Sequence, residues 1–337
     1  MTDESPLLRL PEVTINHILY FCDYLEIARL CNVCHSLRNH IDFFKPDAHV
    51  DEVWLGNQQN AEMYFKTDKS SRIWVGYTAV EGGCRVECMH HMNSRSVTTI
   101  SGMDRMDALI QDFKIYLRHL KTPLKKFKLN RTYCDPLIQI MRSQPPESRI
   151  FPLKVNELEL YGLSQDHILA TLSLFDANYL KDLKIENETE GDELNDGAED
   201  YFHALFETEQ WKNAERICLS HKFKISSVRQ ISHLKEFGGS ISRVTAADVE
   251  FLKNTFISSP LFEECRITAD VDIDVLSITE AFGAPSYEVI EGIAHLWYFH
   301  IPNDTNSALS VKVINEQIID IDRINRRRVI PGVAIIY

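Results

Sequence analysis

A short pattern, apolar-x-x-apolar-x-apolar, recurs along the second half of the chain and constrains its fold most. It occurs at Leu124–Leu129, Val155–Leu160, Leu180–Ile185, Ala214–Leu219 and Phe262–Ile267, with a degraded copy at Leu234–Gly239. Helical stretches lie between the copies, as in Asp166–Phe175, where Ile168, Leu169 and Leu172 share one stripe. Strands and helices that alternate at this spacing indicate a parallel sheet with helices on one side. We therefore expect an irregular, leucine-rich-repeat-like α/β array.

The residues between the apolar positions of these strands would point to the open face of the sheet. They form two charged columns, and repeat proteins commonly bind partners on such extended surfaces. We therefore predict a substrate-binding face here, and a merely solvated sheet face is the alternative. The columns contain Lys126, Glu157, Asp182, Arg216 and Glu264, and Lys128, Glu159, Lys184, Cys218 and Arg266; the predicted face comprises Lys126, Lys128, Glu157, Glu159, Asp182, Lys184, Arg216 and Arg266.

Two further regions show the alternation of antiparallel strands. Residues 47–122 read as a small β meander with a connecting helix, and the last part of the chain reads as terminal strands that cover the end of the array. A separate segment, 186–200, is rich in carboxylates and reads as an acidic loop. The predicted strands are Val50–Leu55, Met63–Phe65, Ile73–Tyr77, Cys84–Cys88, Ala294–Ile301, Leu309–Ile314 and Gln317–Asp322.

Residues 10–46 have the spacing of short helices. Pro11 suits a first helical turn, and Asp23 stands three residues before Glu26, as in a capping box. Three helices of this length bury too little apolar surface to be secure alone. Part of their apolar surface is therefore expected to meet a partner or the rest of the chain.

Cysteine patterns in this part of the chain permit two cofactor readings. Cys31, Cys34 and His35 match the spacing of a c-type haem attachment, but Cys34 also falls on the apolar stripe of its helix. Cys84 and Cys88, followed by His90 and His91, suggest zinc, although adjacent histidines on a strand point to opposite faces. Core packing explains these cysteines without a ligand, so we predict no metal and no cofactor.

The order of residues over the first helices resembles an F-box. The match runs through Leu10-Pro11-Glu12, Ile18-Leu19, Asp23, Leu30, Val33-Cys34, Leu37-Arg38 and Ile41-Asp42, with Leu37 where many F-boxes carry tryptophan. The resemblance implies docking on the Skp-type adaptor of a cullin ubiquitin ligase. The implied residues divide between the adaptor interface and helix packing, which the sequence does not separate: Leu10, Pro11, Ile18, Leu19, Leu30, Val33 and Leu37.

The order of elements after the F-box resembles the FTH-type domain of the nematode F-box A family. This implies an α+β chain with a flexible tail at 1–9, an F-box at 10–46, a meander at 47–122 and an FTH-type domain at 123–337. The family's domain is thought to recognise the target, so the resemblance implies a substrate receptor of a ubiquitin ligase. A non-degradative interaction scaffold is the alternative.

Composition and motifs exclude several other classes. A net charge of −13 opposes binding to nucleic acid, and no apolar run reaches membrane-spanning length. The local patterns of nucleophilic, phosphate-binding and zinc-dependent enzymes are missing from the sequence, so we expect no catalysis. The acidic N-terminus lacks an export signal, and we expect a cytoplasmic or nuclear protein.

Overall fold

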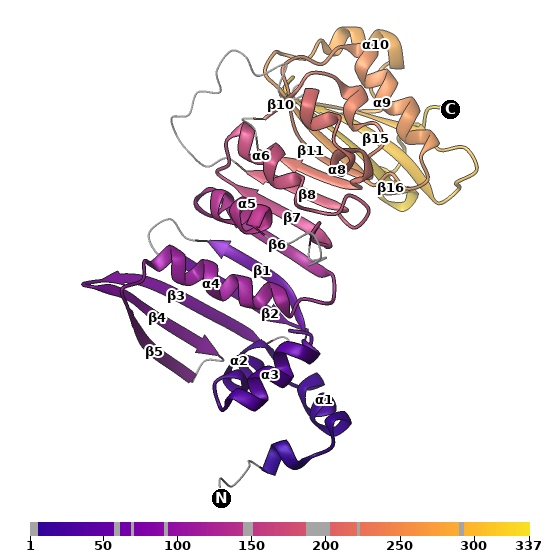
Figure 1. Cartoon of the computed structure of the whole chain (residues 1–337). Coiled ribbons are helices and arrows are strands. Elements are labelled where there is room, and N and C mark those ends of the chain that lie inside the picture. Colours follow the sequence, from indigo (N-terminus) through magenta and orange to yellow (C-terminus); the bar gives the residue numbers. More distant parts are fainter. Residues whose placement is uncertain are drawn as a thin grey trace, which may run out of the picture. The chain divides into compact units, whose positions relative to one another are not determined.

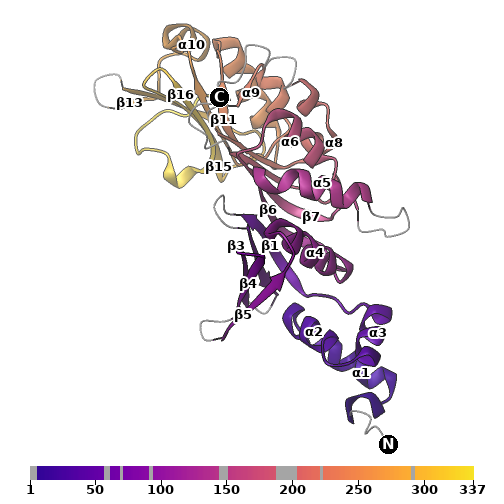
Figure 2. The same ribbon diagram turned by 60° about the vertical axis from the view of Figure 1, so that its left-hand side comes forward.

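The computed structural model describes residues 6–56, 61–68, 71–90, 94–143, 151–186, 203–220, 223–289 and 293–337. Its contacts separate two compact units, residues 1–180 and residues 181–337. Figures 1 and 2 show the chain from two sides, coloured along the sequence.

The first unit begins with a short 3-10 helix, η1 (Pro6–Arg9), and the helices α1 (Glu12–Tyr20), α2 (Tyr24–Cys31) and α3 (His35–Phe44). The predicted capping box is confirmed, since Asp23 accepts from the Glu26 backbone and Glu26 accepts from the Asp23 backbone. The expected tail at 1–9 is partly wrong, because η1 is helical and Leu7 packs against the helical core. The buried members of that core are Ile15, Leu19, Ile27, Leu37 and Ile41.

The sheet of the first unit has the strand order β7-β6-β1-β2-β3-β4-β5. Strands β1 to β5 form the predicted antiparallel meander, and β1 also pairs with β6 in parallel, as β6 does with β7. The strands are β1 (Val50–Gly56), β2 (Ala61–Thr67), β3 (Arg72–Val80), β4 (Gly83–His90), β5 (Ser94–Ser101), β6 (Leu124–Asn130) and β7 (Val155–Tyr161).

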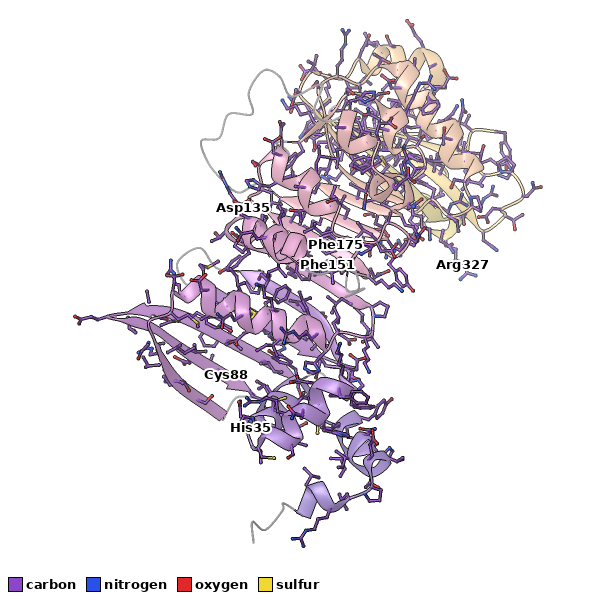
Figure 3. The ribbon with its side chains drawn as sticks, viewed as in Figure 1. His35, Cys88, Asp135, Phe151, Phe175 and Arg327 are labelled. Carbon is purple, nitrogen blue, oxygen red and sulfur yellow. The ribbon has the colours of Figure 1, made fainter. Side chains whose placement is uncertain are left out.

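Helices cover one side of this sheet, as Figure 2 shows. Helix α4 (Arg105–Arg118) starts at the N-cap Asp104 and packs against β2, β3 and β4. Helices α5 (Cys134–Ser143) and α6 (Gln165–Leu172) pack against each other, and a short η2 (Arg131–Tyr133) precedes them. Aromatic rings fill the space between these helices and the sheet. The ring centroid of Phe127 lies 5.5 Å from that of Phe175, which Figure 3 labels.

The structure divides the chain at a different place from the boundary expected after residue 122. Parallel pairing of Val53 with Phe127 and of Leu55 with Leu129 joins the meander to the first repeat strand. The meander and the first two repeat strands therefore share one sheet in the first unit, and the division falls between Leu180 and Lys181. Hydrophobic patterning identified both segments but contains no information on which strands of different segments pair.

The second unit contains four parallel strands followed by an antiparallel group, in the order β8-β9-β11-β12-β16-β15-β14-β13. Strand β12 pairs with β16 in antiparallel fashion, so the terminal strands continue the parallel ones. The strands are β8 (Asp182–Glu186), β9 (Arg216–Leu219), β10 (Lys224–Ile225, which pairs with β11), β11 (Glu236–Ile241), β12 (Glu264–Ala269), β13 (Tyr287–Val289), β14 (Ala294–His300), β15 (Ser307–Ile314) and β16 (Ile318–Asn325).

The second unit also contains α8 (Glu209–Asn213), η4 (Val228–Ile231), α9 (Ala246–Ser258), α10 (Val275–Phe282) and η5 (Arg326–Arg328). Helix α9 begins with a capping box between Thr245 and Asp248 and packs against α10 and β15. Every predicted apolar triplet is a strand, and the chain has the expected α+β class with mixed sheets. The leucine-rich-repeat-like description is not confirmed.

Candidate protein-binding surfaces

The predicted adaptor residues separate into two groups in the structure. Leu19 and Leu37 are each only 1% exposed and belong to the core of the three helices. Burial there corrects the prediction for these two residues, because a buried side chain offers no contact area to a partner. Their role is packing between helices.

The other predicted adaptor residues remain accessible. Leu10, Ile18 and Val33 are exposed, Pro11 lies at the exposed N-cap of α1, and Leu30 is half-buried against the helical core. The sequence analysis missed further exposed apolar side chains on the same helices and at their ends. Their one signal in the sequence is that they are large apolar residues beside the predicted helical stripe. These are Val13, Tyr20, Phe21 and Phe43. Exposed apolar side chains gathered on one small domain are typical of a protein-binding surface.

In the first unit, the predicted substrate face contains a compact charge network. Glu159 accepts hydrogen bonds or ion pairs from Lys126 and Lys128, each at 2.6 Å, and from the Tyr161 hydroxyl at 2.5 Å. Lys126 also bonds Glu157 at 2.5 Å. Burial would raise the pKa of Glu159, but these three donors outweigh it and lower the pKa to about 2.

This network corrects part of the prediction. Lys126, Lys128 and Glu157 are half-buried and face the open side of the sheet as expected. The side chain of Glu159, however, lies beneath the lysines and is only 6% exposed. Its carboxylate fixes the lysines in place and is not presented to a partner.

In the second unit, the predicted charged residues form separate pairs. Arg216 lies opposite Asp182 and bonds it at 2.7 Å, while Lys184 pairs with Glu186 at 2.5 Å. Arg266 lies opposite Asp320 at 3.6 Å, and its side chain is 62% exposed. Arg266 is therefore the most accessible of the predicted cations in this unit. The acidic segment beyond Glu186 lies outside the described residues.

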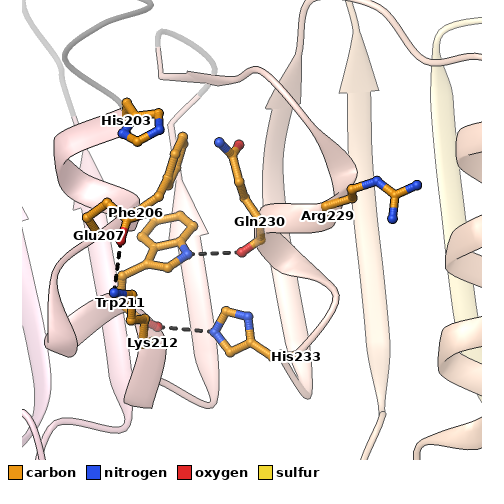
Figure 4. A pocket seen from close by; sticks show the side chains of 8 residues that line it. All are labelled: His203, Phe206, Glu207, Trp211, Lys212, Arg229, Gln230 and His233. Atoms are coloured by element: carbon orange, nitrogen blue, oxygen red, sulfur yellow. Dashed lines mark hydrogen bonds and ion pairs between the residues drawn. The ribbon is translucent and has the colours of Figure 1, made fainter.

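A cavity of about 230 Å³ lies beside α8 in the second unit (Figure 4). The buried Trp211 donates its indole N–H to the Gln230 carbonyl at 3.0 Å, and Lys212 donates to Glu207 at 3.0 Å. His233 contacts the Trp211 carbonyl at 3.1 Å. These polar groups therefore bond to one another or to the backbone in the wall of the cavity.

The cysteines of the two predicted cofactor motifs, Cys31, Cys34, Cys84 and Cys88, are buried or half-buried. Cys31 and Cys34 are partly buried against the helical core, and burial raises the pKa of the Cys31 thiol. His35, labelled in Figure 3, is exposed at the start of α3. Cys84 is buried, and His91 lies outside the described residues. Within the described ranges, no three His, Cys, Asp or Glu side chains gather as a metal site, and no helix is long and apolar enough to cross a membrane.

Comparison with known protein families identifies the domains that carry these surfaces. The F-box domain model matches residues 7–48, which contain the three helices, and the FTH domain model matches residues 146–286. The chain contains an F-box domain and an FTH domain. Their presence and order confirm the predicted resemblance to nematode-type F-box proteins with an FTH domain.

A relative supports this architecture along most of the F-box/FTH chain. F-box A protein 224 of Caenorhabditis elegans is 24% identical over 304 residues, which cover 87% of this chain and 73% of the relative. No solved structure matches the chain. The F-box domain implies binding of a Skp1-type adaptor and suggests an adaptor role in ubiquitin ligases, and F-box proteins are generally non-catalytic.

Proposed function

We propose that this protein is the substrate-recognition subunit of a Skp-cullin-F-box ubiquitin ligase. In this proposal the F-box docks on the Skp-type adaptor and, through it, on the cullin, while the open sheet faces of the following region bind the target protein. The protein itself performs no chemistry, because the ligase's other subunits transfer ubiquitin.

One observation carries the proposal. The F-box helices bury their own core, yet Leu10, Ile18 and Val33 stay exposed. Full burial of each large aliphatic side chain is worth roughly 1.5–3 kcal/mol, whereas association costs about 4–15 kcal/mol. Several such side chains must be buried together for binding, and the F-box supplies them from α1 and from the segments that flank its helices.

The target-binding part of the proposal rests on the charged residues of the open faces. We assign this role to Lys126, Lys128 and Glu157 of the first unit and to Arg266 of the second, with Asp182, Lys184 and Arg216 as paired neighbours. Charged groups of this kind contribute to partner choice more than to affinity, especially where they remain accessible.

Affinity purification of the tagged full chain from cells tests the proposal. We expect a Skp-type adaptor together with a cullin. Recovery of the adaptor without a cullin would instead favour the non-degradative scaffold, and recovery of neither would overturn the adaptor role. The matched control is the same chain with Leu19→Asp, which places a charge in the core of the F-box helices.

A further inference from the structure

Two tryptophans lie on the outer face of the meander, opposite the face that α4 covers. Trp54 of β1 and Trp74 of β3 are both in register with Tyr64 of β2, which lies between them. Met89 of β4 continues the row beyond Trp74. Trp54 is 43% and Met89 41% exposed, while Tyr64 and Trp74 are half-buried, so the row is most open to solvent at Trp54 and Met89. We call Trp54, Tyr64, Trp74 and Met89 the aromatic row.

Two glycines shape the aromatic row. Gly56 and Gly76 each follow a tryptophan by two residues on the same face of the same strand. A Cβ added at either position would lie closer than 3.0 Å to the indole of Trp54 or Trp74. Each indole therefore lies over a glycine, in space that the side chain of any other residue would fill. This arrangement holds two flat rings against the sheet, with their outer surfaces available for contact.

Cations stand at both ends of the aromatic row. Lys128 of β6 is in register with Trp54, and Arg95 of β5 is in register with Met89. Both have carboxylate neighbours, but the cations are more accessible: Arg95 is 64% exposed against 16% for Glu87, and Lys128 is 32% exposed against 6% for Glu159. The ends of the row therefore present positive charge to solvent.

We propose that the aromatic row binds a proline-rich segment in polyproline II conformation, with a carboxylate at each end. Aromatic-lined grooves are the usual docking surface for such segments, whose conformation is formed before binding. A polyproline II helix repeats about every 9.3 Å, and strands two apart in a sheet are separated by about 9.6 Å. Trp54 and Trp74 are two strands apart, so each meets one turn of the same segment.

Length and charge fit the same ligand. The row from Lys128 to Arg95 crosses five interstrand steps, or about 24 Å, and eight residues of polyproline II extend about 25 Å. Terminal carboxylates on such a segment reach Lys128 at one end and Arg95 at the other. Arg72 and Arg85, which flank the row on the same face, have no carboxylate partner within the described part of the chain.

Single-stranded nucleic acid also stacks on aromatic side chains, but this face opposes it. Glu52, Glu62 and Glu87 point to the same side as the two indoles. Although Lys66 pairs with Glu52 and Arg95 pairs with Glu87, these carboxylates disfavour a phosphate backbone along the row. A proline-rich segment carries no charge between its two ends. Binding of a proline-rich segment does not depend on the ligase role. Only the assignment of that segment to the target protein rests on the proposed function.

The probe is a fluorescein-labelled peptide of one aspartate, six prolines and one aspartate, titrated into the full chain. We expect binding that protects tryptophan fluorescence from acrylamide. Trp211 and Trp297 are 1% and 0% exposed, so the accessible signal comes from Trp54 and Trp74. Comparison peptides replace the prolines by glycine and serine, or the aspartates by lysine, and a uridine octamer tests nucleic acid.

Variants locate the site. Trp74→Ala is expected to weaken binding of the aspartate–proline peptide by about tenfold or more, and Leu276→Ala, at an exposed leucine of the second unit, should leave it unchanged. Gly76→Ala keeps both tryptophans but displaces one indole, and we expect about fivefold weaker binding. Equal melting temperatures of all variants verify that the fold is intact.

The proposal would be overturned if the chain did not bind the aspartate–proline peptide, or if Trp74→Ala and Gly76→Ala bound it as tightly as the wild type does. It would also be overturned if the wild type bound the glycine–serine peptide equally well, or bound the lysine peptide or the uridine octamer more tightly. Capture of the Skp-type adaptor is measured on the same preparations. Retained adaptor with no peptide binding overturns this inference alone, whereas loss of adaptor with peptide binding overturns the ligase role alone.

Discussion

The ring of Tyr24, in the second F-box helix, lies 5.2 Å from the ring of Phe65 in β2. Tyr116 of α4 completes the cluster, at 5.6 Å from Tyr24 and 4.8 Å from Phe65. The Tyr24 hydroxyl also donates to the Asp112 carbonyl at 3.4 Å. The F-box is therefore packed onto the meander and not joined to it by a linker alone. A partner bound to the F-box is held in a defined orientation to the sheet of the first unit.

Replacement of Tyr24 by alanine is expected to lower the free energy of unfolding by about 3–5 kcal/mol. The ring is 7% exposed and its removal leaves a cavity between α2, α4 and β2. Urea denaturation measures the loss, and hydrogen exchange should show weaker protection in α2. Tyr20→Ala is the control, since Tyr20 is 60% exposed and its loss should cost less than about 0.5 kcal/mol. Equal effects of the two changes would contradict the role of Tyr24.

The change Glu159→Gln removes the carboxylate that holds Lys126 and Lys128. We expect a loss of about 1–3 kcal/mol in the free energy of unfolding at pH 7, because hydrogen bonds to charged groups are lost. The control is Glu157→Gln, whose side chain is 34% exposed and should cost less than about 1 kcal/mol. Urea denaturation of both variants provides the measurement.

The pH dependence gives an independent check on Glu159. Its pKa falls from 4.5 to about 2 on folding, so the stabilisation is fully present above about pH 4.5 and is lost as the pH falls toward 2. The difference in stability between wild type and Glu159→Gln should shrink over that interval. A difference that stays constant down to pH 2 would show that the carboxylate does not act through its charge.

The change Val33→Asp tests the adaptor surface. Val33 is 63% exposed, so aspartate is expected to leave the melting temperature unchanged while weakening adaptor binding by about tenfold or more, because several apolar contacts must be buried together. Binding of purified adaptor by calorimetry measures the effect. Leu276→Asp, on α10 of the second unit, is the matched control at a similarly exposed site. Unchanged adaptor affinity in Val33→Asp would remove this residue from the interface.

Two aspartates of the second unit should respond oppositely to neutralisation. Burial, followed by the charges of Asp320 and Glu264, raises the pKa of Asp322, so its ionised form opposes folding at neutral pH. Asp322→Asn is therefore expected to raise the melting temperature at pH 7, with a gain that disappears as the pH falls toward 3.8, the ordinary pKa of the side chain.

Asp304 provides the counterpart. Hydrogen bonds from Ser307 and Asn306, together with Arg323, lower the pKa of Asp304. Its charge is stabilising above the ordinary pKa and is lost at lower pH, so Asp304→Asn should lower the melting temperature at pH 7. Scanning calorimetry of the two variants at pH 7 and pH 4 distinguishes the signs. A loss in Asp322→Asn at pH 7 would show that this carboxylate is stabilising.

Sequence patterning predicted most of the strands because those buried on both sides, or on a strictly alternating face, carry their environment in their composition. It missed β5, which lies at the edge of the sheet. This strand has only two large apolar residues, Val97 and Ile100, and so shows no clear apolar alternation. It also placed a boundary between the meander and β6. The pairing of β1 with β6 connects residues about 70 positions apart, and apolar periodicity is local information.

The candidate sites show the same limit. The stripe of the F-box helices includes both Leu19, which is buried, and Ile18, which is exposed, because adjacent apolar residues satisfy one helical stripe almost equally. The aromatic row did have a signal: Trp54-Leu55-Gly56 and Trp74-Val75-Gly76 repeat with Tyr64 midway. Recognition of that signal requires the register between strands, which the structure supplies.

Strand β13 forms the outer edge at the C-terminal end of the second unit's sheet and is only three residues long. A parallel strand such as β12 left at that position would offer a full row of free backbone donors and acceptors. Such an edge recruits strands from other molecules and promotes aggregation. In this chain β16, β15 and β14 lie between β12 and the short edge strand β13. This arrangement limits the self-association to which extended sheets are prone.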